Sequence, residues 1–280
     1  MTLIQRKDGT MYDLLDAGIR TRNVLISSST PIHHFEEVEG GNGVIDYGTT
    51  YGPREITCYY RAQSSSITGF SLLRDEIFNL FRTEESFYLI EKRERGKRWL
   101  VKVVNPFAIP QRNVYGDFEV EFIGIRGVSE SIGTTQDIHN NGINADDGLW
   151  GFGMGLEAVD ESLIYTHNAT VNKPFFIYNA GDVSIHPFEQ KFKMTISNVR
   201  GSTERFQITN LTNGSRARIN VPLRSTDVVV YDGPNVTRNK LTFLRDTRKD
   251  FIELSPGWNN FRIYYCDSAT ISFDFPFYYL

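Results

Sequence analysis

The chain has few cysteines, which excludes the disulfide-stabilised and zinc-dependent classes of small protein. Only Cys58 and Cys266 occur in 280 residues, and two thiols are too few for a disulfide framework or a zinc site. Each lies in a strand-like run among apolar neighbours. Because a reducing cytosol opposes the pairing of thiols, we interpret both as buried free thiols.

Long apolar runs are also missing. The N-terminal sequence MTLIQRKDGTMYDLL lacks the apolar stretch of about 7 to 15 residues found in signal peptides. No segment approaches the roughly 18 apolar residues of a membrane helix. We therefore expect synthesis in the cytoplasm of the producing cell and no membrane insertion.

The sequence has no excess of positive charge. It contains 30 Lys and Arg residues against 34 Asp and Glu, a net charge of −4. Residues 1–148 carry −5, from 16 basic and 21 acidic residues, and residues 149–280 carry +1, from 14 basic and 13 acidic residues. A nucleic-acid-binding domain is normally clearly basic, so specific nucleic-acid binding is predicted for neither half.

Motifs for catalysis, phosphate binding and metal binding are missing as well. No serine lies in a G-x-S-x-G sequence, and the glycine-rich residues 40–43 are not followed by the Lys and Ser/Thr of a phosphate-binding loop. His33, His34, Glu36 and Glu37 lack the H-E-x-x-H spacing of a zinc site, so we interpret them as part of a solvated loop. The sequence predicts no catalytic residue, no cofactor, no metal site and no enzyme activity.

The first half predicts one amphipathic helix among strands. In ITGFSLLRDEIFNLF, Ile67 to Phe81, apolar residues recur at helical spacing, with Thr68 at the N-cap. The polar side of this segment is mixed in sign, which favours packing on a sheet over binding to a membrane surface. Apolar and polar residues alternate, as in strands, over 56–61, 99–104 and 117–122.

The stretch LIEKRERGKRWLVKVV, Leu89 to Val104, places five basic and two acidic side chains between two apolar runs. It indicates a hairpin that turns at Arg95-Gly96, because glycine adopts a positive φ without steric cost. The local charge of +3 also suits a phosphate contact, but acidic residues are interspersed and stacking aromatic residues are lacking. We favour a solvated or protein-contacting turn, since charge on strands also prevents unwanted edge pairing.

A change in composition marks a domain boundary. Residues 127–155 are rich in Gly, Asn, Asp, Ser and Thr and show no periodicity. Trp150 and Phe152 are too apolar for a free linker, so this segment is expected to lie against one domain or a neighbouring subunit.

The second half reads as short strands separated by turn signals, of which Asn213-Gly214 is the strongest. This pattern predicts a β-sandwich or jelly roll. In the last strand, 271–277, the alternating Phe273, Phe275 and Phe277 are expected to form one buried face. Pro276 cannot donate a hydrogen bond, which predicts an unpaired side of that strand.

Several segments, taken in order, resemble one family. GTTYGPREITCYYRA, SLLRDEIFNLF, ESFYLIEKRERGKRWLVKVVNPFAIPQ and GDFEVEFIGIRGVSES resemble the N-terminal domain of the distal tail proteins of siphophages that infect Gram-positive bacteria. This match covers about Gly48 to Ser131. KPFFIYNAGDVSIHP, FQITNLTNG, LSPGWNNF and ISFDFPFYYL are similar to the second domain of that family. No single motif is chemically diagnostic; their order makes the match specific.

The resemblance implies a mainly β protein with one prominent helix. Residues 1–131 would be an α+β ring-forming tail domain with a sheet, a helix and a long hairpin. Residues 132–157 would be a linker, and residues 158–280 a galectin-like or jelly-roll β-sandwich.

The resemblance also implies a structural role in the virion. Six copies of such a protein form a hub at the distal end of the tail. This hub joins the tail tube protein to the tail-associated fibre or lysin protein, and often to receptor-binding proteins. DNA only passes through the ring, and the −5 charge of the first half is compatible with a repulsive lumen.

A closed ring needs two different complementary surfaces on each subunit. We expect the 89–104 hairpin and the glycine-rich segment 40–53 to supply them, because both extend beyond what a small core requires. The predicted interface residues are Arg93, Arg95, Lys97 and Arg98 in the first segment, and Asn42 and Tyr47 in the second.

An alternative reading is a carbohydrate-binding module that contacts host cell-wall glycans. β-Sandwiches can display aromatic platforms, and the second half contains Trp258, Tyr264, Tyr265, Tyr278 and Tyr279. Most of these rings could equally lie in the core, and a fold does not fix a function.

Overall fold

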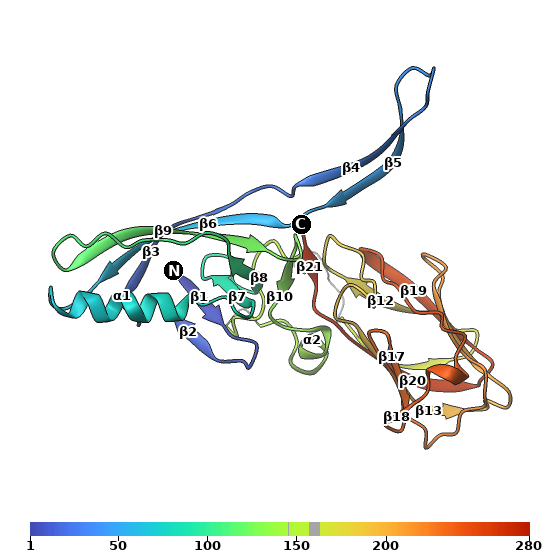
Figure 1. Ribbon diagram of the computed structural model, residues 1–280. Coiled ribbons are helices and arrows are strands. Elements are labelled where there is room, and N and C mark those ends of the chain that lie inside the picture. The colour runs from blue at the N-terminus through green and yellow to red at the C-terminus, as the bar shows by residue number, and fades with distance from the viewer. Residues whose placement is uncertain (145, 157–162) are drawn as a thin grey trace. The chain divides into compact units, whose positions relative to one another are not determined.

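The computed structural model describes residues 1–144, 146–156 and 163–280. The protein is mainly β, with helices α1 and α2 and several antiparallel sheets (Figure 1). Contacts divide the chain into unit 1, Met1–Ser129 with Leu280, and unit 2, Glu130–Tyr279. The predicted start of a second domain at residue 158 lies outside the described residues. No helix in the described part of the chain is long and apolar enough to cross a membrane.

Unit 1 is built on an antiparallel sheet with the strand order β2-β1-β7-β8-β9-β6-β3. Its longest ladder joins β6 and β9 in unbroken register, from Arg54 opposite Gly124 to Gln63 opposite Tyr115. The elements are β1 (Thr2–Gln5), β2 (Met11–Asp13), β3 (Ile19–Ile26), β6 (Arg54–Gln63), α1 (Gly69–Leu80), β7 (Phe87–Glu91), β8 (Lys97–Val103) and β9 (Tyr115–Gly124).

Helix α1 confirms the predicted amphipathic segment. Phe70 and Ile77 are buried in the core of unit 1, where the inward side of the sheet supplies alternating apolar residues. Thr68 occupies the N-cap position, but its side chain makes no capping bond; the Ser66 hydroxyl accepts the Gly69 N–H instead, at 3.0 Å. At the other end the Arg6 guanidinium donates to the Leu80 carbonyl at 2.6 Å, so a carbonyl that the helix leaves unpaired is satisfied.

The core of unit 1 is rich in contacts between aromatic rings. Phe81 packs between Tyr60 and Phe122, with ring centroids 5.6 and 5.9 Å apart, and Phe122 also meets Phe87 edge-on at 6.2 Å. Cys58 lies in the same core, where burial raises the pKa of its thiol to about 12. Burial likewise raises the pKa of Cys266 to about 11. Both cysteines are buried and free, as predicted.

A second, two-stranded sheet in unit 1 consists of β4 (Pro31–Glu37) and β5 (Val44–Tyr51). Sequence reasoning assigned His33 to Glu37 to a loop, and that assignment is wrong in part. The residues are solvated as expected, but they form a strand because β5 pairs with them on both sides of a register shift between His33 and Phe35. The sequence does not indicate this strand, because apolar and polar residues do not alternate along it.

Unit 2 contains two antiparallel sheets that pack face to face. One has the order β11-β20-β13-β16-β17-β18 and the other β12-β19-β14-β15. Phe261 of the smaller sheet meets Phe273 of the larger at 5.1 Å between ring centroids. The strands are β11 (Thr166–Thr170), β12 (Phe175–Asn179), β13 (Lys193–Arg200), β14 (Phe206–Asn210), β15 (Arg216–Ile219), β16 (Val229–Asp232), β17 (Asn235–Arg238), β18 (Leu241–Thr242), β19 (Gly257–Tyr264) and β20 (Ser268–Asp274), and a 3₁₀ turn spans Leu244–Asp246.

The C-terminal segment confirms one prediction and corrects another. Phe273, Phe275 and Phe277 are all fully buried, as their alternation indicated. The predicted strand 271–277 is shorter, because β20 ends at Asp274 and a new strand, β21 (Tyr278–Tyr279), follows Pro276. Proline has no N–H for a ladder, and the chain therefore leaves the sheet before it.

The segment predicted as a linker, 132–157, belongs to unit 2 by its contacts over its described part. It follows β10 (Ser129–Ser131) and contains α2 (Thr135–Asn141), which begins with a capping box between Thr134 and Asp137. Trp150 is buried, with its ring 6.1 Å from Phe277, as expected for a segment that lies against a domain. Phe152 is 98% exposed in the single chain, so it does not pack on unit 2, and its contact with a neighbouring subunit stays a prediction.

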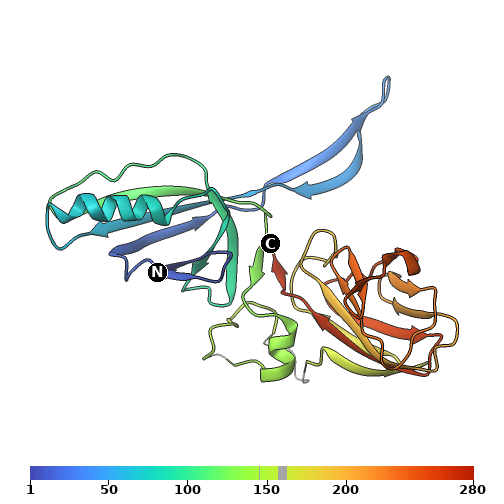
Figure 2. The same cartoon turned by 60° about the horizontal axis from the view of Figure 1, so that its bottom comes forward.

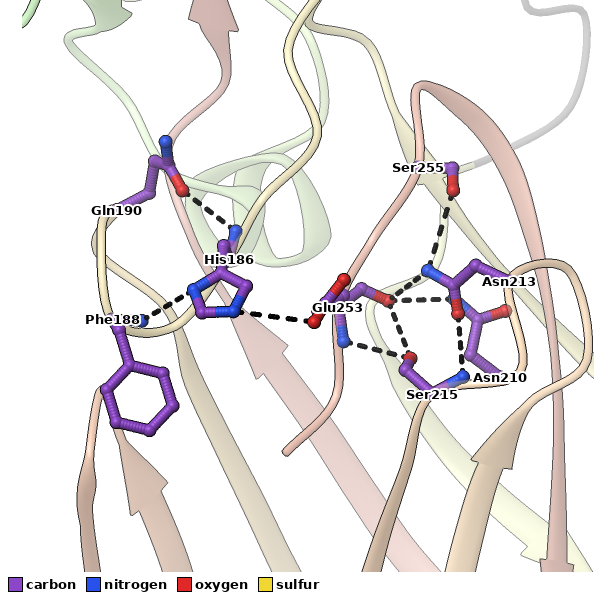
Figure 3. A network of polar contacts seen from close by, with 8 residues as sticks. All are labelled: His186, Phe188, Gln190, Asn210, Asn213, Ser215, Glu253 and Ser255. Atoms are coloured by element: carbon purple, nitrogen blue, oxygen red, sulfur yellow. Dashed lines mark hydrogen bonds and ion pairs between the residues drawn. The ribbon is translucent and has the colours of Figure 1, made fainter. Parts of the chain in front are cut away.

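A polar network fixes the loop before β19 to the β14–β15 hairpin (Figure 3). The Glu253 carbonyl accepts hydrogen bonds from Asn210 Nδ2 at 2.8 Å, Asn213 Nδ2 at 3.0 Å and Ser215 Oγ at 3.2 Å. Gly214 takes the positive φ of the predicted turn, +78°, whereas Asn213 contributes through its side chain. Through these three hydrogen bonds the Glu253 carbonyl ties its loop to the β14–β15 hairpin, so we assign the network a structural role.

Asp227 holds a second buried network, and it predicts an acid-sensitive contribution to stability. Its side chain is 5% exposed and accepts from Arg238 Nη2 at 2.5 Å and from the Arg224 N–H at 2.6 Å. Burial by itself would raise the pKa of this carboxyl, but these hydrogen bonds and the Arg238 charge hold the pKa below its usual value of 3.8. A carboxyl whose pKa is lower in the folded than in the unfolded protein stabilises the fold at pH values above its unfolded-state pKa. This stabilisation is lost as the pH falls through the folded-state pKa.

We therefore expect Asp227→Asn to lower the free energy of unfolding by about 2 kcal/mol at pH 7. Urea unfolding at pH 7 and at pH 3 measures the effect, and the difference from the wild-type protein should shrink at pH 3. Asp232→Asn, at an exposed position on β16, is the matched control and should change stability little. An equal difference at both pH values would contradict the assignment.

Candidate assembly surfaces

The β4–β5 hairpin, residues 31–51, is called the arm below. Every residue of both strands is exposed, so neither face of this small sheet is covered. Figures 1 and 2 show it as a separate two-stranded extension (blue) beyond the main sheet of unit 1. Seven large apolar side chains on it are exposed: Ile32, Phe35, Val38, Val44, Ile45, Tyr47 and Tyr51.

Cross-strand side-chain contacts hold the arm in shape. His33 Nδ1 lies 2.9 Å from Thr49 Oγ1, and its ring stacks on Phe35 with centroids 5.5 Å apart. On the other face His34 Nε2 lies 2.9 Å from Thr50 Oγ1. These local contacts give the hairpin a defined surface, although it lacks a core.

The predicted interface residues Asn42 and Tyr47 both lie on the arm. Asn42 is exposed in the loop between the two strands, and Tyr47 projects from β5. The Tyr47 hydroxyl donates a hydrogen bond to Glu36, which raises the pKa of the phenol. With Glu36, Glu37, Glu39 and Asp46 and no Lys or Arg, residues 31–51 carry a net charge of −4.

The other predicted interface residues lie in the turn between β7 and β8. The hairpin is confirmed: Leu89 pairs with Trp99, and Gly96 takes a φ of +89° at the turn. The turn, residues 91–98, has a net charge of +3, from five basic and two acidic side chains.

The four predicted basic residues of this turn are not equivalent. Arg98 donates to Gln5 Oε1 at 2.9 Å and lies 4.2 Å above the Tyr88 ring, so it helps to hold the turn to β1. Arg93 forms an ion pair with Glu91. Lys97 is partly buried, whereas Arg93 and Arg95 are exposed. Arg93 and Arg95 are therefore the better placed of the four for an external contact.

Lys92, which the sequence analysis did not include among the interface residues, anchors the turn. Its Nζ lies 2.5 Å from Asp13 Oδ2 at the end of β2. Burial opposes ionisation of Asp13, but the hydrogen bond from Lys92 and that from the Leu15 N–H hold the pKa of the carboxyl below its usual value. The turn is thus a fixed basic projection on the main sheet, and the arm is an acidic one on a separate sheet.

Of the seven exposed apolar residues of the arm, the sequence predicted only Tyr47 as an interface residue. Phe35 and Ile45 are next to the charged residues Glu36 and Asp46 in the sequence. Because apolar and polar residues do not alternate regularly here, the sequence shows no period that would indicate an apolar face. That both faces of the hairpin are open is visible only in the structure, where every residue of β4 and β5 is exposed.

Comparison with known proteins supports a tail assignment for unit 1. Residues 7–123 match the family described as phage tail protein RIFT-related domain. No curated protein sequence matches the chain.

Among solved structures, the chain is similar to the Dit protein (gp 19.1) of phage SPP1, described as a paradigm of the hub adsorption apparatus in phages that infect Gram-positive bacteria. The TM-score is 0.68 at 9% sequence identity, over 99% of both chains. Chains of the phage P2 baseplate in its activated conformation, with Ca or with Sr, match with TM-scores of 0.43 and 0.42 at 8% identity, over 99% of this chain and 98% of theirs. At such identity the SPP1 match establishes the fold of the chain.

Proposed function

Because residues 7–123 match the phage tail protein RIFT-related domain, we propose that this chain is the structural hub protein at the distal end of a siphophage tail. Six copies form a closed ring that joins the tail tube to the tail-tip and host-adhesion proteins. Whole-chain similarity in fold to SPP1 Dit supports this function. Within the proposal, residues 1–131 form the ring, residues 132–157 connect, and residues 158–280 are a galectin-like domain that faces outward.

The exposed arm is the observation that carries the proposal. An isolated two-stranded hairpin is only marginally stable in water, and this one exposes apolar side chains on strands that no element in the described part of the chain covers. Contiguous exposed apolar surface marks an interaction site. A neighbouring copy of the chain would cover the arm in an assembled ring.

Charge supports a head-to-tail arrangement of the copies. The arm carries −4 and the β7–β8 turn carries +3, and complementary potentials across an interface fix its register. Two different surfaces that complement each other generate a ring when the rotation closes. In this arrangement the arm of one subunit meets the turn of the next, and the contact repeats at each subunit.

The partners of the proposed hub are the copies of this chain, the tail tube protein, the tail-associated fibre or lysin protein and receptor-binding proteins. Its place is the distal end of the tail in the virion. DNA passes through the ring without a specific contact.

The mass of the purified protein in solution tests the proposal. Light scattering coupled to gel filtration, and native mass spectrometry, should show a hexamer, either alone or after addition of the tail tube protein as a template. A chain that stays monomeric at high concentration and in the presence of the tail tube protein would contradict the ring.

A further inference from the structure

The two outer faces of unit 2 differ in chemistry. On the larger sheet, β11, β13 and β20 present mainly Ser, Thr and Asn, and these side chains bond to one another: Thr166 Oγ1 donates to Ser272 Oγ at 3.0 Å, and Thr270 Oγ1 donates to Asn168 Oδ1 at 2.8 Å. Most hydrogen-bonding groups of this face are therefore satisfied within it, and among its outward described residues only Asp274 Oδ1 is a buried atom without a partner.

The outer face of the smaller sheet has rings and arginines instead. We call it the aromatic–arginine face. It is formed by Phe176 and Tyr178 on β12, Trp258, Asn260 and Arg262 on β19, and Arg216 and Arg218 on β15.

The rings gather at one end of this face. Tyr178 and Trp258 are paired across β12 and β19, with centroids 4.9 Å apart, and Phe176 meets Trp258 edge-on at 6.5 Å. Trp258 is 44% exposed and Phe176 is 47% exposed, so solvent reaches both rings. Their π-faces are electron-rich, and the C–H face of a sugar ring, which carries partial positive charge, can stack on them.

The arginines lie at the other end. Arg262 and Arg216 both stand opposite Thr209, which places them in one row across β19, β14 and β15. Arg216 also pairs with Asp250 at 3.1 Å. Among the outward residues of these four strands, all of which the structure describes, none is acidic. The face therefore favours an anionic ligand.

Some polar groups of this face lack hydrogen-bond partners. Within the described residues, Asn260 Oδ1, Arg262 Nε and Arg218 Nε are buried atoms without a hydrogen-bond partner. Buried polar groups in folded proteins normally have partners. A ligand that reorients these side chains would supply partners for all three atoms, whereas the corresponding atom of the larger sheet, Asp274 Oδ1, belongs to an acidic group that would repel an anionic ligand.

Spacing defines the size of the ligand. Trp258 and Arg262 are four residues apart on β19, which corresponds to about 13 Å along a strand. One sugar ring cannot reach both ends, so the ligand is a chain of sugars. The guanidinium fork matches a planar carboxylate in a bidentate pair, and in a uronic acid the carboxylate is attached directly to the sugar ring.

We propose that the aromatic–arginine face binds a polysaccharide that carries carboxylate groups. Sugar rings stack on Trp258 and Tyr178, and carboxylates pair with Arg262 and Arg218. This site lies within unit 2 and does not depend on ring formation by unit 1, so its test and the test of the hub are separate.

Binding of oligogalacturonate to the full-length protein, measured by isothermal titration calorimetry at low salt, tests the proposal. We expect binding that weakens as salt is added, because the ion pairs are screened. Trp258→Ala and Arg262→Ala should each reduce affinity by about tenfold or more. The methyl ester of the same oligosaccharide, which keeps the sugar rings and loses the charge, should bind at least as poorly as the Arg262→Ala variant binds the acid.

Matched controls separate this site from general effects. Phe188→Ala removes another exposed ring of unit 2, and Arg200→Ala removes an exposed arginine of β13; neither should change affinity. No binding of oligogalacturonate, equal binding of the methyl ester, or binding that Trp258→Ala leaves unchanged would overturn the proposal. Polyphosphate, which has no sugar ring, is the remaining probe, and tighter binding of it than of oligogalacturonate would show a general polyanion surface and also overturn the proposal.

Discussion

Replacement of the arm by a two-residue Asn-Gly turn is expected to abolish the hexamer and leave a folded monomer. The Gly52 N–H donates to the Thr30 carbonyl at 2.9 Å, so the two ends of the arm are adjacent and a tight hairpin turn can connect them. Because every residue of β4 and β5 is exposed, their removal takes no side chain from the core of unit 1. A stable interface buries more than about 1,000 Å², and the arm supplies most of the apolar area that we assign to this contact.

Light scattering coupled to gel filtration measures the loss of the hexamer, and circular dichroism and thermal unfolding show that the variant is folded. Leu241→Ser, which removes an apolar side chain of unit 2 that is 73% exposed, is the matched control and should leave the oligomer unchanged. If the armless chain still formed hexamers, the arm would have no part in the ring.

Reversal of charge on either surface is expected to weaken assembly, and reversal on both should restore it. Glu37→Lys with Glu39→Lys reverses part of the arm, and Arg93→Glu with Arg95→Glu reverses the exposed part of the turn. Juxtaposed like charges cost several kcal/mol, so each double variant should associate roughly hundredfold more weakly. In the quadruple variant the signs are again opposite, and assembly should recover.

Recovery of assembly in the quadruple variant would distinguish a direct contact from a folding defect, because the losses of association free energy from two independent defects would add. Sedimentation velocity over a range of protein concentrations measures the association of all three variants. Glu84→Lys with Glu85→Lys, on the exposed segment after α1, makes the same change of charge elsewhere on unit 1 and serves as the control. A quadruple variant weaker than either double variant would exclude contact between the arm and the turn. Arg98 is left in place because it holds the turn to β1 through Gln5.

The helices and strands that pack in the interior were predictable, because burial of one face makes apolar residues recur at the period of the helix or strand. Helix α1 follows from apolar residues at helical spacing, and the β7–β8 hairpin from two apolar runs around Arg95-Gly96. Phe273, Phe275 and Phe277 alternate because one side of the C-terminal segment faces the core. In each case the sequence pattern reflects contact with the interior.

The candidate surfaces were predictable only in part. The basic turn is visible as a run of charge, but that Arg98 is held by Gln5 and Tyr88 while Arg93 and Arg95 stay exposed depends on the pairing of β7 with β1 and β8. On the aromatic–arginine face, Trp258 was noticed as an aromatic residue with an undecided position. Its neighbour Tyr178 comes from β12, and Arg216 of β15 lies in one row with Arg262 of β19. Strand pairing alone brings these residues onto one face.

The sequence by itself determined that this chain is mainly β with an amphipathic helix, has two unpaired thiols and resembles a tail protein, because periodicity, composition and motif order are properties of the linear chain. The tertiary structure decided that residues 31–51 form an uncovered acidic arm, that the segment 132–156, over its described part, packs with unit 2, and that rings and arginines share one sheet face. These features depend on which strands pair and on what covers them, and long-range contacts of that kind leave no local signal in the sequence.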